Sequence, residues 1–326
     1  MKDVAARAGV GLKTVSRVVN GEAGVTPEMV ARVQTAIAEL GFRRNDSARL
    51  LRKGRTASVA LLLEDIADPF SGQLSRAVEE VARAHGSLLF TGSSGEDPRH
   101  EQELALAFCA RRVDGLVMIP AGGDHRYLLP ELAAGIAAVF VDRPARLIDA
   151  DAALTDNAGG ARAGVEHLIR HGHRRIGFLG DLPRIHTAAE RLRGYRQAMA
   201  RAGLPVDEAW IAMAPTDPAT VAASLDRVTG GPAPVTAVLS GNNRITLGVL
   251  RRLPSLLARP ALVGFDDLEL ADLLTPGLTV VAQDPAALGR AAAELLFRRL
   301  AGDAAPPRRL VLPARLIPRG SGETGP

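Results

Sequence analysis

The chain has 326 residues, 47% of them hydrophobic, which suits two or three folding units with sizeable cores. No apolar run approaches the roughly 20 residues that a membrane helix needs, and no signal-peptide pattern follows Met1, so we expect a cytoplasmic protein without a membrane partner. The charge is uneven, because the first 56 residues carry eleven Lys and Arg against five Asp and Glu, while the rest is slightly acidic. A basic module on an acidic body is typical of a polyanion-binding domain attached to a sensor.

The first two helices are predicted over residues 3–8 and 12–19. The first has one apolar face and ends at the glycine turn Gly9-Val10-Gly11. The second turns three valines, Val15, Val18 and Val19, inward. Its outward face consists of Leu12, Lys13, Ser16 and Arg17. Two short helices joined by a three-residue turn are typical of a helix-turn-helix, whose second helix fits the major groove of DNA.

A third helix is predicted after Thr26, which is a good N-cap, with Pro27 at the first helical position and Glu28 near the positive end of the helix dipole. Gly41 ends it. We expect its buried stripe to consist of Val30, Val33, Ile37 and Leu40.

Residues 43–55 form a basic stretch that contains Leu50 and Leu51 and has a glycine near its end. Isolated helices shorter than about 12 residues are marginal in water, so we expect this hinge to become ordered only on a partner. A plain charged linker is the alternative.

From Ala57 onward, short apolar runs alternate with amphipathic stretches of helical length. We interpret nine runs as buried strands: SVALLL, SLLFT, DGLVMIP, AAVFVD, RRIGFLG, TAVLS, ALVGF, LTVVAQ and RRLVLP. This rhythm predicts parallel sheets covered by helices on both faces, arranged as one large sheet or as two.

The segments DVAARAGV, TVSRVVNG and VTPEMVARVQTAIAELGF resemble the headpiece of the lactose-repressor (LacI) and GalR family of bacterial transcriptional regulators. ADPFSGQL, VFVDRP, TDNAGGARAGVEHL, RLRGY, TAVLSGNNRITLG, VGFDD and LTVVAQD extend the resemblance over nearly the whole chain. The resemblance implies an all-α helix-turn-helix headpiece (1–45), a hinge (46–56) and an α/β core (57–326). The core is then expected to have two Rossmann-like parallel-sheet lobes, like a periplasmic binding protein. Lobe 1 would hold about 57–156 and 285–315, and lobe 2 about 157–284 and the C-terminal tail.

Carried over residue by residue, the family's DNA-binding positions are Leu12, Lys13, Ser16, Arg17, Asn20, Arg49 and Leu51. Arg17 would bridge guanine O6 and N7, and Leu51 would wedge into the minor groove. The positions that match the family's ligand contacts are Phe70, Ser71, Arg191, Asn243, Asp266 and Gln283.

Four residues depart from the family pattern: Gly11 and Leu50 stand where Ser is usual, Ser71 stands where an aromatic residue is frequent, and Asn243 stands where Asp is common. Without that Asp we expect Arg191 to lack a balancing carboxylate. The effector is therefore expected to be a neutral sugar or polyol, with an anionic derivative left open.

Other chemistry has little support in the sequence. Cys109 has no partner for an internal disulfide and is expected in the core. His167 and His171 stand at i and i+4, with His173 nearby, which allows a metal site, but a structural role near a helix C-terminus is favoured. No dinucleotide fingerprint, P-loop or nucleophile–base motif is present, so we expect no enzyme, cofactor or metal.

These features together favour a homodimeric repressor on pseudo-palindromic double-stranded operator DNA, regulated by a small polar metabolite bound between the lobes. No heptad pattern follows the last strand, and we expect the tail SGETGP to be short and flexible, which favours a dimer over a tetramer. A solute-binding protein of a transporter and a sugar-modifying enzyme on the same scaffold are the alternatives.

Overall fold

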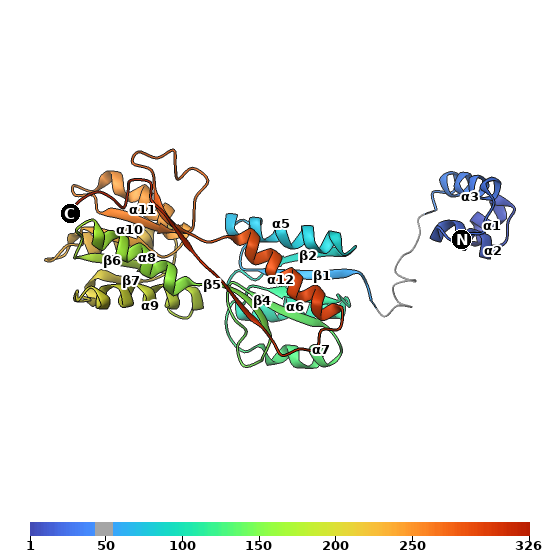
Figure 1. Ribbon diagram of the computed structural model, residues 1–326, viewed down its shortest axis with the longest axis horizontal. Helices are drawn as coiled ribbons and strands as arrows, with labels where there is room; N and C mark the ends of the chain where they lie inside the picture. Colours follow the sequence, from blue (N-terminus) through green and yellow to red (C-terminus); the bar gives the residue numbers. More distant parts are fainter. Residues whose placement is uncertain (43–54) are drawn as a thin grey trace. The chain divides into compact units, whose positions relative to one another are not determined.

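The computed structural model describes residues 1–42 and 55–326 (Figure 1). The chain divides into two compact units, Met1–Thr56 and Ala57–Pro326. Arg49 and Leu51, two of the predicted DNA contacts, lie outside the described residues together with most of the predicted hinge.

The described residues of the first unit form three helices, α1 (Lys2–Ala8), α2 (Leu12–Asn20) and α3 (Pro27–Glu39). Their shared core consists of Val4, Ala5, Ala8, Val15, Val33 and Ala36. Gly9 ends α1 with φ +62°, a conformation that suits glycine, and Arg32 of α3 donates to the carbonyl of Ala8 at 2.6 Å. The three predicted helices are confirmed, but the prediction that Leu40 is buried was wrong. Leu40 is 46% exposed at the C-terminal end of α3, and Ala36 fills the inner face instead.

The second unit contains two six-stranded sheets. The first is parallel throughout, in the order β11-β5-β4-β3-β1-β2. Its strands are β1 (Ser58–Leu63), β2 (Leu88–Ser93), β3 (Gly115–Met118), β4 (Ala137–Val141), β5 (Asp151–Thr155) and β11 (Arg309–Leu312). The associated helices are α5 (Pro69–Ala84), α6 (Pro98–Ala110), η2 (His125–Leu128), α7 (Leu129–Ala133) and α12 (Pro285–Leu300).

The second sheet has the order β12-β10-β9-β8-β6-β7, and only β12 runs antiparallel to its neighbour. Its strands are β6 (Ile176–Gly180), β7 (Ile211–Met213), β8 (Ala237–Ser240), β9 (Ala261–Phe265), β10 (Thr279–Ala282) and β12 (Arg315–Ile317). The associated helices are α8 (Asn157–Arg170), α9 (His186–Arg201), η3 (Glu208–Trp210), α10 (Pro218–Gly230), α11 (Asn243–Arg252) and η4 (Leu253–Ser255).

The buried strands supply side chains to both faces of each sheet. Val59, Leu61 and Leu63 of β1 pack with α5 and α12, which lie side by side on one face of the first sheet (Figure 1). Ala60 and Leu62, which alternate with them, pack on the opposite face with residues of α6. The predicted α/β core of two parallel-sheet lobes covered by helices is therefore confirmed, together with the α-helical headpiece.

The chain passes between the two sheets three times. It leaves the first sheet after β5 for α8, returns from β10 to α12, and goes directly from β11 to β12. Because parallel strands bring their carboxyl ends to one edge of a sheet, this arrangement places loops from both lobes around a common space.

Some expectations about the strands were wrong. SLLFT and RRLVLP were expected to be buried, but β2 and β11 are largely exposed because they form the two edges of the first sheet. The short strands β5, β7 and β12 were missed. β5 begins at Asp151, a charged residue whose carboxylate accepts hydrogen bonds from Arg299 (2.6 Å), so the apolar pattern alone did not reveal it.

The C-terminal tail is packed against the second lobe rather than flexible. Ser321 hydroxyl donates to the carbonyl of Leu262 at 2.6 Å, and the Glu323 carboxylate accepts a hydrogen bond from Thr279 at 2.8 Å. Within the described part of the chain, no helix is long and apolar enough to cross a membrane.

Candidate functional site

The predicted recognition helix, α2, has a polar face turned away from the small core of the first unit. Leu12, Lys13 and Asn20 are exposed, while Ser16 and Arg17 are half-buried. Asn20 amide donates to the Ser16 hydroxyl at 3.3 Å and to Glu22 at 3.1 Å. α2 therefore offers five of the seven predicted DNA-binding side chains from neighbouring turns of one helix.

The N-terminus of α2 shows the effect of Gly11. Gly11 is the N-cap residue, with extended φ and ψ of −67° and 150°, and no side-chain hydrogen bond caps the helix. At α3, by contrast, the Thr26 hydroxyl accepts from the amide of Met29 at 3.4 Å.

A cavity of about 540 Å³ lies in the second unit where the two lobes meet. Its volume suits a small ligand. Five of the six residues that were predicted to bind the effector line it: Phe70, Arg191, Asn243, Asp266 and Gln283. Four of these, all except Arg191, also line a second cavity of about 1080 Å³, so they form a wall between the two spaces.

The sixth predicted ligand residue, Ser71, does not line either cavity. Its side chain in the first turn of α5 is completely buried, and its hydroxyl has no hydrogen-bond partner among the described residues. The structure thus corrects the expectation that Ser71 contacts the ligand directly, because the neighbouring Phe70 faces the cavity instead.

Arg191 projects from α9 and is only 4% exposed. Its guanidinium donates to Asn157 Oδ1 at 2.7 Å and to the carbonyl of Gly241 at 2.6 Å. It also lies 3.8 Å above the ring centre of Phe265, and its NH1 is 3.9 Å from Asp266 Oδ2. The expectation that Arg191 lacks a balancing carboxylate was therefore wrong: Asp266 supplies one.

The other two residues of the R-x-x-G-Y motif, Gly194 and Tyr195, fix the position of the helix that carries Arg191. A Cβ on Gly194 would lie 2.2 Å from the carbonyl oxygen of Ala158, so only glycine lets α9 approach α8 this closely. Tyr195 is fully buried, and its hydroxyl donates to the carbonyl of Ile176 at 2.8 Å. The motif thus anchors α9 to β6 and α8, with Arg191 directed into the cavity.

Gln283 and Asp266 form a continuous polar network with Arg191. Gln283 amide donates to Asp266 Oδ1 at 2.6 Å, and its oxygen accepts from the Thr155 hydroxyl at 2.7 Å. Asp266 has a positive φ of 73°, an uncommon conformation for a residue with a side chain that is found often at ligand sites.

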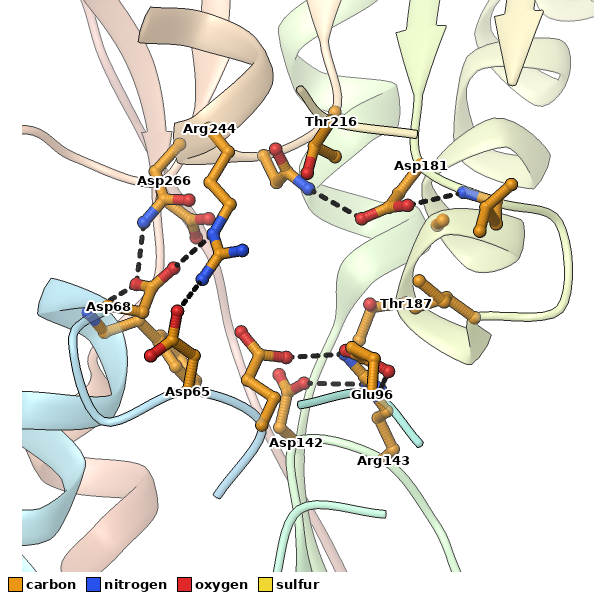
Figure 2. A pocket seen from close by; sticks show the side chains of 18 of the residues that line it. Asp65, Asp68, Glu96, Asp142, Arg143, Asp181, Thr187, Thr216, Arg244 and Asp266 are labelled. Carbon is orange, nitrogen blue, oxygen red and sulfur yellow. Dashed lines mark hydrogen bonds and ion pairs between the residues drawn. The ribbon is translucent and has the colours of Figure 1, made fainter. Parts of the chain in front are cut away.

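Polar contacts connect the two lobes across the mouth of the cavity (Figure 2). Asn243, at the start of α11 in the second lobe, donates its amide to Asp68 Oδ1 at 2.8 Å. The next residue, Arg244, pairs with Asp65 at 2.5 Å and with Asp68 at 3.4 Å. Asp65 and Asp68 both belong to the segment between β1 and α5 of the first lobe.

On the first-lobe side of the cavity, the guanidinium of Arg143 forms ion pairs with three carboxyl groups. Arg143 donates to Glu64 at 2.7 Å and to Glu96 at 2.8 and 2.5 Å, and it lies 3.6 Å from Asp142 (Figure 2). Arg143 also donates to the carbonyl of Pro120 at 3.0 Å.

Burial and neighbouring charges shift the acidities of these carboxyl groups. Burial raises the pKa of Glu64 to about 8, against the opposing charge of Arg143 and with the help of the nearby Glu96 carboxylate. Burial also raises the pKa of Asp142 and of Asp266. At Glu96 burial acts in the same direction, but the hydrogen bonds and charge of Arg143 outweigh it, and the pKa of Glu96 lies below its ordinary value.

Sequence reasoning missed most of the charged residues of the cavity. They are Glu64, Asp65, Asp68, Glu96, Asp142, Arg143, Asp181, Arg184 and Arg244. A usable signal was present, because Glu64, Asp142 and Asp181 each follow the last residue of a buried strand directly, as the predicted Asp266 does. Residues just beyond the carboxyl ends of parallel strands are the ones that face ligands.

The three histidines considered for a metal site have structural partners instead. His167 Nε2 lies 2.5 Å from Glu323, and His173 contacts the Thr236 hydroxyl at 2.9 Å and the carbonyl of Thr324 at 2.7 Å. His171 contacts the carbonyl of His167 at 2.9 Å. Among the residues that the structure describes, no group of three or more His, Cys, Asp or Glu side chains is arranged to hold a metal ion.

Comparison with known proteins agrees with both units. Residues 1–45 match the family model of bacterial regulatory proteins of the lacI family, and residues 165–322 match a periplasmic binding protein-like domain. The HTH-type transcriptional regulator CelR of Thermobifida fusca is 34% identical over 333 residues, covering 98% of this chain and 97% of the relative.

Solved structures give the same result over the full length. A complex of the transcriptional regulator CelR with cellobiose is 31% identical, with a TM-score of 0.72 and coverage of 98% of each chain. The lac repressor dimer bound to operator and an anti-inducer is 25% identical, with a TM-score of 0.85 and coverage of 99% of this chain and 98% of that one.

Proposed function

The chain belongs to the lacI family of bacterial regulatory proteins and is a DNA-binding transcriptional regulator rather than an enzyme, and from this premise we propose how its two units work. The headpiece binds an operator in the major groove through α2. A small polar ligand, a sugar or sugar derivative, binds in the 540 Å³ cavity and changes the affinity for the operator. The protein acts as a repressor in the compartment that contains the DNA, which places it in the cytoplasm.

The observation that carries this proposal is the exposed polar face of α2. We assign base contacts to Leu12, Lys13, Ser16, Arg17 and Asn20, and, from the family resemblance alone, minor-groove and backbone contacts to Leu51 and Arg49. The planar fork of Arg17 suits the two acceptors of a guanine edge. We also propose that residues 1–45, 46–56 and 57–326 act as headpiece, hinge and core.

A homodimer on a pseudo-palindromic operator is the assembly we propose, supported by the lac repressor dimer on its operator, which shares the fold over nearly the whole chain. The sugar class is supported by the cellobiose complex of CelR. It is also supported by the cavity lining, where hydrogen-bond donors and acceptors are mixed beside the apolar ring of Phe70; these polar residues are Arg191, Asn243, Asp266 and Gln283.

Coupling between ligand and operator follows from the contacts across the cavity. Asn243 and Arg244 of one lobe hold Asp68 and Asp65 of the other, so a ligand in the cavity alters the relation of the lobes. A coupling free energy of about 1 to 3 kcal/mol is typical of such linkage.

Selection of bound DNA from a random pool by the full chain tests this function. We expect one palindromic sequence to be enriched and Arg17→Ala to lose about 1 to 3 kcal/mol of affinity for it, with relaxed choice at one base position. Arg76→Ala is the control, because it removes the same charge from an exposed side chain on α5 of the second unit, and it should bind DNA like the parent. Failure to enrich any sequence, or unchanged affinity of Arg17→Ala, would contradict the proposal.

A further inference from the structure

The charge in the ligand cavity is not balanced. Seven carboxyl groups and four guanidinium groups line it, so the carboxyl groups outnumber the guanidinium groups even when Glu64 holds a proton. Three carboxylates, those of Glu64, Glu96 and Asp142, gather around the single guanidinium of Arg143. They come from the ends of β1 and β4 and from the turn between β2 and α6, so three separate segments of the first lobe bring negative charge to one place.

Asp142 is the carboxylate that this cluster leaves without a hydrogen bond. Its side chain is only 8% exposed, and its one charged contact among the described residues, to Arg143 Nε at 3.6 Å, is too long for a hydrogen bond. Arg143 Nε itself is buried without a partner. Asp142 nevertheless lines the cavity, from a backbone with a φ of +65°. A largely buried carboxylate with one ion pair and no hydrogen bond is costly, so its presence in a cavity wall favours a ligand that donates to it.

The other charges around the cavity do not supply that donor. Arg244 already pairs with the carboxylates of Asp65 and Asp68. Arg191 already donates to Asn157 and to the carbonyl of Gly241 and lies beside the carboxylate of Asp266. Asp181 and Arg184 line the facing wall of the second lobe with one charge of each sign. The negative charge around Arg143 therefore exceeds the positive charge that these residues supply, and a cationic group of the ligand can pair with it.

We propose that the effector is a polyhydroxylated amine, such as an amino sugar, whose ammonium group lies against the carboxylates of Glu64, Glu96 and Asp142. This inference rests on the proposed function of the cavity. An ammonium group has three donors and no acceptor, so it pairs with carboxylates without leaving a polar atom unmatched. Charge-assisted hydrogen bonds are about twice as strong as neutral ones, which favours the amine over a hydroxyl at the same position.

The same cluster rejects other ligand classes. A carboxylate or phosphate placed there would face like charges in a buried site and lose affinity. An acetylated amine keeps the position and much of the bulk of the substituent but has no charge, so it isolates the contribution of the ammonium group.

Proton release is an additional signature. Because burial raises the pKa of Glu64 to about 8, this carboxyl holds a proton at neutral pH when the cavity is empty. A nearby ammonium group lowers that pKa and drives the proton off. Titration calorimetry at pH 7 in phosphate and in HEPES, whose ionisation enthalpies differ, should therefore show proton release for an amino sugar and none for its acetylated form.

The test uses the full chain and matched sugars: glucose, galactose, mannose and cellobiose, each with its amino, N-acetylamino and uronic acid counterparts. Thermal shift identifies the series that binds, and calorimetry measures the dissociation constants. We expect the amino sugar to bind at least about tenfold more tightly than its acetylated form. Glu96→Gln should remove this preference. Glu79→Gln, on the exposed side of α5, should leave it unchanged.

Asp142→Asn is the second variant, which keeps the proposal testable if Glu96→Gln does not fold, and far-ultraviolet circular dichroism of the full chain reports whether each variant is folded. Equal affinity for the amino and acetylated forms, with no effect of Glu96→Gln, would overturn the amine while leaving the proposed function intact. Absence of any shift across the whole panel would count against the sugar class in both proposals.

Discussion

Replacement of Arg191 by alanine should destabilise the second lobe strongly, because this residue has a structural role as well as a place in the cavity. The substitution removes two hydrogen bonds, to Asn157 (2.7 Å) and to the carbonyl of Gly241 (2.6 Å), and the stacking of the guanidinium on Phe265. It also leaves the buried Asp266 without its positive neighbour.

The magnitude follows from the loss of a buried guanidinium that donates two hydrogen bonds and lies 3.9 Å from the Asp266 carboxylate, since removing one partner of a buried charge pair costs about 3 to 5 kcal/mol. The free energies of the stacking and of the hydrogen bonds are partly included in this value, because contacts within one network do not contribute additively. We therefore expect Arg191→Ala to lower the free energy of unfolding of the second lobe by about 4 kcal/mol, a large share of the stability of a typical domain.

Urea unfolding followed by tryptophan fluorescence measures this change in the full chain. The protein has one tryptophan, Trp210, which is 7% exposed in the second lobe and donates to the carbonyl of Ala233 at 3.0 Å, so its emission reports that lobe alone. Arg193→Ala is the control, because Arg193 is on the same helix but its side chain is 54% exposed, and its ion pair among the residues that the structure describes is with Glu190. We expect the control to cost less than about 1 kcal/mol. If Arg191→Ala is no less stable than Arg193→Ala, the buried network has been misinterpreted.

Three further outcomes are expected. The pKa of Glu64 in the folded protein, about 8, lies above its ordinary value, so the stability linked to this carboxyl is complete below about pH 4.5 and is lost as the pH rises through 8. Glu64→Gln should therefore unfold like the parent near pH 4 and be more stable by about 1 to 3 kcal/mol at pH 8, as urea titrations at the two pH values will show. Gly11→Ser should raise headpiece stability by about 0.5 kcal/mol, measured by amide hydrogen exchange of Leu12–Asn20 in the full chain, since a Cβ at Gly11 meets no atom within 4 Å. Asn243→Asp should weaken ligand-free contact between the lobes and lower the core melting temperature, and the exchange of both residues in Asp68→Asn/Asn243→Asp should restore much of it.

The parts of the molecule that depend on local sequence were predictable. Helix α2 follows from the spacing of Val15, Val18 and Val19 and from the glycines on either side, and its outward residues follow from the same spacing. The sheets were predictable wherever a strand is buried on both faces, as in β1 and β9, because such strands are continuous apolar runs.

Features that depend on contacts between distant segments were not predictable in the same way. The apolar run of β2 does not reveal that it forms a sheet edge, and Asp151 conceals β5 because its partner, Arg299, lies 148 positions away in the chain. The docking of Glu323 depends on Thr279 and His167, which belong to two other elements. Ser71 was misplaced because one residue of helical rotation separates the cavity face of α5 from its buried face.

The contact with Asp68 explains why this chain has Asn243 where Asp is common in the family. The Asn243 amide donates to Asp68, whose carboxylate also caps α5 by accepting from the amide of Phe70 at 2.9 Å. An Asp at position 243 would bring a second carboxylate to the same place, in a cavity that already has surplus negative charge, so an amide is the residue that keeps the two lobes in contact. Arg244 reinforces this contact through the same Asp68. The lobes are thus joined by residues that line the cavity itself, and a ligand that competes for those carboxylates or adds positive charge beside them changes the inter-lobe contact directly.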